Sequence, residues 1–112
     1  MIFDLEQRTT KFAKSVIELC KNLSRNPIND RLIHQVIGSA GSIGGNYREA
    51  NDSLGKKDFL HRMRISRREA KETIFWLDLI SEANKHKVKE INTLITEATE
   101  LKKIFSAILN KF

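Results

Sequence analysis

Apolar residues recur alternately three and four positions apart in four separate segments of this 112-residue chain. The segments cover about residues 4–25, 30–51, 56–83 and 88–111. This spacing keeps apolar side chains on one face of a helix, and the seven-residue rhythm is typical of helices that pack along one another. Short polar connections favour antiparallel neighbours. The sequence therefore predicts one all-α domain, residues 1–112, folded as an antiparallel up-down-up-down four-helix bundle, although a domain-swapped dimer of hairpins would share the pattern.

The ends of the helices carry recognisable signals. Asp4 is a suitable cap for the first helix, and Asn26-Pro27 is predicted to end it, because the residue before proline avoids the helical conformation. Asn29 is predicted to be the N-cap of the second helix. Residues 51–55 are rich in helix breakers, and residues 84–87 are polar, so both are predicted to be turns.

Four of the five glycines lie inside the predicted second helix, between residues 38 and 45. Each interior glycine costs about 1 kcal/mol relative to alanine, and close contact with another helix would offset this cost. Gly38, Gly41 and Gly45 fall on one face, so this face is predicted to receive a neighbouring helix. On this interpretation, Gly41→Leu disrupts folding or assembly.

The residues that enzymes and metal sites need are sparse in this chain. A di-metal bundle requires Glu-x-x-His on two helices, whereas the nearest pattern, Asp58-x-x-His61, occurs once. Cys20 falls on the apolar side of the first helix, where a buried thiol is the ordinary interpretation. The glycines are not followed by Lys-Ser or Lys-Thr, so they do not form a phosphate-binding loop. We expect no enzymatic activity, no catalytic residue, no metal site and no cofactor.

The net charge of +6 is concentrated in one segment. Residues 56–71 hold seven basic and two acidic residues, a net charge of +5. Cations on one helical face can follow the phosphates of a nucleic acid, although they can also pair with a neighbouring subunit or simply be solvated. Further cations occur at Arg8, Lys11 and Lys14 and at Lys102-Lys103, and only the fold decides whether they join the same surface. The predicted nucleic-acid-binding residues are Lys57, Arg64, Arg67, Arg68 and Lys71.

Three adjacent residues, Ile74, Phe75 and Trp76, cannot all face one core, so part of this set is predicted to form an oligomer interface.

A single cysteine excludes an intramolecular disulfide and favours a reducing compartment. The sequence shows neither a signal peptide nor an apolar run long enough to span a membrane. We expect a cytoplasmic homo-oligomer with no membrane association.

Three stretches of the sequence resemble one known family. They are SAGSIGGNYREA at residues 39–50, GKKDF at 55–59 and RREAKETIFWL at 67–77. They resemble the bacterial four-helix bundle family whose genes were first noticed in intervening sequences within 23S ribosomal RNA genes. The resemblance implies an antiparallel four-helix bundle, a ring-shaped homopentamer, and no established enzymatic activity or cofactor.

A related branch of that family comprises the accessory variability proteins of diversity-generating retroelements, which are basic pentamers that bind a reverse transcriptase and nucleic acid. Two hypotheses for this chain follow. The first is a non-enzymatic oligomeric bundle that binds structured RNA or DNA through its basic face. The alternative is a protein–protein adaptor, for example a partner of a reverse transcriptase, without direct contact with nucleic acid.

Overall fold

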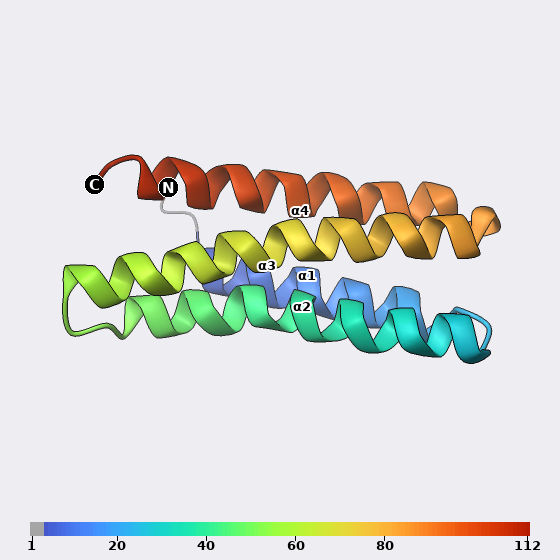
Figure 1. Cartoon of the computed structure of the whole chain (residues 1–112). Helices are drawn as coiled ribbons and strands as arrows, with labels where there is room; N and C mark the ends of the chain where they lie inside the picture. Colours follow the sequence, from blue (N-terminus) through green and yellow to red (C-terminus); the bar gives the residue numbers. More distant parts are fainter. Residues whose placement is uncertain (1–3) are drawn as a thin grey trace.

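A computed structural model describes residues 4–112, and within this range it contains four long helices and no strand. The helices are α1 (Leu5–Lys21), α2 (Pro27–Asn51), α3 (Lys56–Ala83) and α4 (Val88–Leu109), and a single 3₁₀ turn, η1 (Lys85–Lys87), precedes α4. They run alternately up and down in a bundle of 44 × 26 × 20 Å (Figure 1). The predicted all-α, antiparallel four-helix bundle is confirmed.

Each helix packs against its neighbours in the chain, and α1 closes the bundle against α4. Among the neighbouring pairs, the contact between α2 and α3 is the most extensive and that between α1 and α4 the least; across the diagonal, the Tyr47 ring of α2 lies 6.1 Å from the Phe105 ring of α4, centroid to centroid. The largest fully buried side chains come from all four helices, so the core is continuous along the bundle. They include Val16, Ile43, Met63, Leu77 and Phe105. None of the helices described here is long and apolar enough to cross a membrane.

The first turn of the bundle differs from the sequence prediction. Asp4 caps α1 as expected, since its carboxylate accepts hydrogen bonds from the backbone N–H groups of Glu6 and Gln7. However, α1 ends at Lys21, and α2 begins at Pro27, with Asn26 as its N-cap. Proline has no N–H to satisfy, which suits it to the first position of a helix. The prediction of Asn29 as N-cap is therefore wrong.

Asn29 instead forms a buried amide pair with Asn84 from the far end of α3. Each side chain donates to the other, at 3.0 Å and 2.8 Å. The second amide proton of each goes to a backbone carbonyl, that of Ser24 or Ile80. Buried amides are costly unless hydrogen-bonded, so this reciprocal pair fixes how α2 and α3 meet at this end of the bundle.

The glycine face of α2 does not receive a helix of the same chain. Gly38, Gly41 and Gly45 are exposed, and a methyl group added to any of them would meet nothing within 4 Å. Gly44 is the buried glycine: a Cβ atom there would lie 2.8 Å from Oγ1 of Thr9. Within the bundle, the prediction that Gly38, Gly41 and Gly45 are helix-packing residues is therefore wrong, because a rotation of about 100° per residue puts Gly44 on the inner side instead.

The two kinds of glycine should respond oppositely to the same substitution. Gly44→Ala forces a methyl group against Thr9, whose hydroxyl is already tied to the carbonyl of Leu5. Overpacking of this kind typically costs about 1–3 kcal/mol, which exceeds the gain in helix propensity. Gly41→Ala meets no neighbour in the chain and should stabilise the bundle by up to about 1 kcal/mol. Urea unfolding of both variants, at concentrations low enough for the chain to be monomeric, measures the difference, and shifts in the same direction would contradict this packing.

The buried thiol of Cys20 predicts a specific pH dependence. Burial raises the pKa of Cys20 to about 11, so the folded protein holds the neutral thiol over a wider pH range than the unfolded chain. In the unfolded chain the pKa of Cys20 is near 9. Above that pH the free energy of unfolding falls progressively, until the thiol also ionises in the folded protein. Compared with Cys20→Ala, the wild-type protein should lose about 2–3 kcal/mol of stability between pH 8 and 11. Parallel unfolding curves for the two proteins across this range would refute the burial of an unionised thiol.

Candidate nucleic-acid interface

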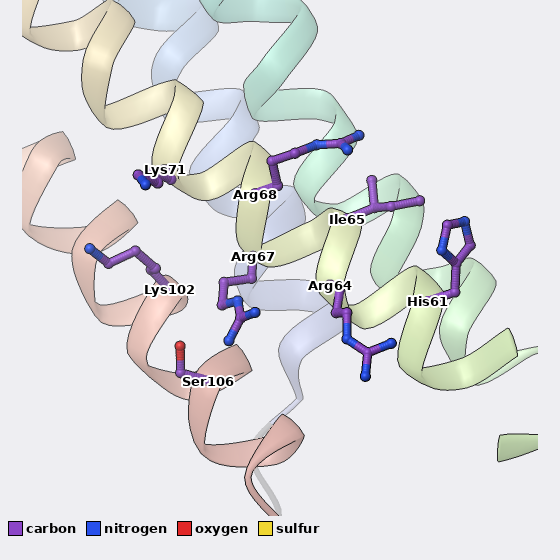
Figure 2. A pocket seen from close by; sticks show the side chains of 8 residues that line it. All are labelled: His61, Arg64, Ile65, Arg67, Arg68, Lys71, Lys102 and Ser106. Atoms are coloured by element: carbon purple, nitrogen blue, oxygen red, sulfur yellow. The ribbon is translucent and has the colours of Figure 1, made fainter. Parts of the chain in front are cut away.

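The basic half of α3 lies beside α4 and forms one side of an open groove of about 680 Å³. Arg64, Arg67, Arg68 and Lys71 line it from α3, together with His61 and Ile65. Lys102 and Ser106 line it from α4 (Figure 2). Four of the five residues predicted for nucleic-acid binding therefore share one groove.

The outward direction of these cations follows from the core face of α3. Met63, Ala70 and Leu77 are fully buried. Arg64 and Lys71 each follow a buried residue by one position, and a step of one residue turns the side chain by about 100°. Charged side chains are not buried in the core without partners. These cations therefore lie along the outer edge where α3 meets α4.

The fifth predicted residue, Lys57, does not line this groove. It lies in a smaller hollow at the α2–α3 loop with Leu54 and Asp58. His61 lines both hollows, so Lys57 extends the basic surface toward the end of the bundle and lies outside the groove itself.

Lys102 is the cation that the sequence could not place. It comes from α4 and lies across the groove from Lys71 and Arg67 (Figure 2). Its sequence neighbour Lys103 is exposed but does not line the groove. The other scattered cations lie elsewhere: Lys11 and Lys14 line a hollow between α1 and α4.

No carboxylate lines the groove, and this distinguishes its cations from those that hold the bundle together. Among residues 4–112, no aspartate or glutamate lies within ion-pair distance of Arg64, Arg67, Lys71 or Lys102. Arg68 approaches only Glu69, at 4.0 Å, and it also borders a second hollow with Trp76 between α2 and α3. The groove is thus a concentration of positive charge that the described part of the chain does not neutralise.

Several cations elsewhere in the bundle have structural partners. Arg8 of α1 donates two hydrogen bonds, of 2.6 Å and 2.7 Å, to the carboxylate of Glu97 of α4, and these bonds raise the pKa of Arg8. Arg48 of α2 pairs with Glu6 of α1 at 3.0 Å. A bidentate, charge-assisted pair fixes two helices more firmly than a single contact, so Arg8 belongs to the seam between α1 and α4.

The three residues predicted for an oligomer interface are unequally exposed. Ile74 and Trp76 pack partly against the core, whereas Phe75 is 52% exposed.

No group of three histidine, cysteine, aspartate or glutamate side chains within residues 4–112 is arranged to hold a metal ion.

Comparisons with known proteins agree with the bundle. The chain matches the family model of the 23S rRNA-intervening sequence protein over residues 3–107. It is similar to a solved structure from Bacteroides thetaiotaomicron, a protein with unknown function from the S23 ribosomal protein family. The two chains share 27% sequence identity and a TM-score of 0.81, over 93% of this chain and 96% of the other. A search of curated proteins gives no significant match.

The contrast between paired and unpaired cations predicts different effects on stability. Arg8→Ala removes a partly buried bidentate pair and should cost about 1–2 kcal/mol of unfolding free energy. Arg64→Ala removes an exposed cation without an ion-pair partner in the described chain and should change it by less than about 0.5 kcal/mol. Thermal or urea unfolding at moderate salt compares the two. A decrease from Arg64→Ala as large as that from Arg8→Ala would mean that the groove cations serve the fold.

Proposed function

The chain belongs to the 23S rRNA-intervening sequence protein family, and we propose that it is a non-enzymatic, oligomeric bundle that binds structured RNA or DNA through the α3–α4 groove. The observation that carries the proposal is the set of cations in that groove without a carboxylate in its lining. Like charges held together repel one another. An anionic ligand relieves that repulsion, and the phosphates of a nucleic acid supply anions in a row.

The chemistry of the groove suits phosphate contacts. Arg64 and Arg67 offer planar guanidinium groups that donate paired hydrogen bonds to phosphate oxygens. Lys71 and Lys102 add compact positive charges from two different helices, and Ser106 adds a hydroxyl. Contacts of this kind fix the position of a nucleic acid without reading its sequence. The proposal therefore assigns binding, and no catalytic step, to these residues.

Self-association is part of the proposal. The exposed face of Gly38, Gly41 and Gly45 costs about 1 kcal/mol per glycine relative to alanine, and no contact within the described chain offsets that cost. Close approach of a second chain would offset it. The homopentamer implied by resemblance remains a prediction, which sedimentation equilibrium can test. We also propose that the protein is cytoplasmic, because the free thiol of Cys20 suits a reducing compartment.

The second candidate is a protein–protein adaptor, in which the groove receives an acidic protein or a reverse transcriptase. The exposed ring of Phe75, four residues beyond Lys71 on α3, favours this candidate, because aromatic residues are enriched at protein interfaces. Pull-down with and without nuclease treatment separates the two hypotheses. Partners that survive nuclease treatment support the adaptor, and partners that disappear support nucleic-acid binding.

Charge reversal in the groove should weaken binding and flatten its salt dependence. We expect Arg64→Glu/Arg67→Glu to reduce the affinity for a hairpin RNA at least about tenfold. The slope of log affinity against log salt should also fall by about 0.7–0.9 for each phosphate that the variant no longer neutralises. Fluorescence anisotropy over a series of salt concentrations measures both quantities.

Lys89→Glu provides the matched control, because Lys89 is exposed at the opposite end of α4 and lies outside the groove. This variant should keep most of the wild-type affinity and salt slope. A flat salt response of the wild-type protein, or equally weakened binding in the groove and control variants, would refute nucleic-acid binding by the groove.

A further inference from the structure

An exposed aromatic ring lies at the end of the row of cations on α3. Phe75 is 52% exposed, and its ring meets the ring of Trp76 edge-on, with 5.0 Å between the centroids. Phe75 follows Lys71 by four residues, so it lies one helical turn further along the same outer face. Contact with a half-buried tryptophan restricts the ring, so an incoming planar group meets a surface that is already in place.

Beyond Phe75, carboxylates appear on this side of α3. Asp78 and Glu82 are exposed one and two turns further on, and with Leu79, Lys85 and Val88 they border a separate hollow. Glu82 lies 3.6 Å from Lys85, so Asp78 is the carboxylate there without an ion pair in the described chain. A carboxylate repels a phosphate brought close to it. A phosphate chain that follows the groove from the α2–α3 loop must therefore end or turn away at Phe75.

Resting on the proposed function, we infer that the groove binds a single-stranded segment of nucleic acid, whose phosphates lie along the cations and whose last base stacks on Phe75. Base–aromatic stacking with a basic track is the common mode of binding single strands. In a duplex, the bases are stacked on one another and only the backbone faces outward, so the ring of Phe75 would gain little. From Arg64 to Phe75 the helix axis extends about 16 Å, which suits a short strand.

The principal test compares single-stranded RNA of about twelve nucleotides with a blunt duplex of the same sequence, using the full chain. Phe75→Ala should weaken single-strand binding about 5- to 100-fold. Duplex binding should change by less than about twofold, and the salt slope should stay the same, because every cation of the groove is still present. Phe75→Tyr should retain the affinity, since its ring still stacks.

Ile28→Ala provides the control for removal of an exposed apolar side chain. Ile28 is 66% exposed at the start of α2, away from the groove, and its truncation should affect neither ligand. Because Phe75 is also exposed, circular dichroism should show unchanged helicity and melting for both alanine variants.

Trp76 gives a second measurement that does not depend on a variant. It is the only tryptophan in the chain and touches the ring of Phe75. A base that stacks on Phe75 should quench the fluorescence of Trp76. We expect saturable quenching with the single strand and none with the duplex.

The outcomes separate this inference from the proposed function. If Phe75→Ala binds the single strand as tightly as the wild type while Arg64→Glu/Arg67→Glu does not, the groove binds nucleic acid but the stacking inference is wrong. If the wild-type protein binds no nucleic acid, the proposed function fails and the inference with it. If Phe75→Ala lowers the molecular mass in sedimentation and weakens both ligands equally, Phe75 belongs to an interface between copies of the chain, which also overturns the inference.

Discussion

The bundle depends on the close contact between α2 and α3, which small and hydroxylated residues make possible. The hydroxyl of Ser66 donates to the backbone carbonyl of Ile43 at 2.9 Å, and the hydroxyl of Thr73 donates to the side-chain hydroxyl of Ser39 at 2.9 Å. Each bond ties a buried polar group of α3 to α2, and each satisfies a group that would otherwise be costly to bury. Such bonds form at only one rotation of the two helices, so they fix the contact more specifically than apolar packing alone.

The rotation of α3 then determines where its basic residues lie. With Ser66 and Thr73 turned toward α2, and Met63, Ala70 and Leu77 in the core, the remaining outer edge faces α4 and solvent. Arg64, Arg67 and Lys71 occupy that edge, and the antiparallel course of α4 brings Lys102 to the same place. The groove thus results from packing on the opposite side of the helix.

The sequence predicted the fold because its apolar spacing is long and regular in all four helices. The prediction for the glycines was wrong, although the spacing of residues in α2 indicates the correct one. Gly44 follows the buried Ala40 by four residues and so shares its face, whereas Gly41 and Gly45 follow buried positions by one residue and face away. The sequence placed four groove residues, since they lie on one helix. The sequence could not place Lys102 opposite α3. That placement depends on the register between α3 and α4, which follows from the geometry of η1. The spacing of residues along one helix does not predict this register.

The two unusual surfaces of the chain lie on helices whose roles do not conflict. The exposed glycines belong to α2, whereas the residues that line the groove all come from α3 and α4. A second copy that approaches the glycine face would therefore leave the α3–α4 groove open in each chain. Several grooves held in one assembly would bind a single nucleic acid together, and the second contact becomes intramolecular once the first has formed. Weak phosphate contacts in one groove would then be sufficient, which is consistent with a groove that is open and lined by only a few cations.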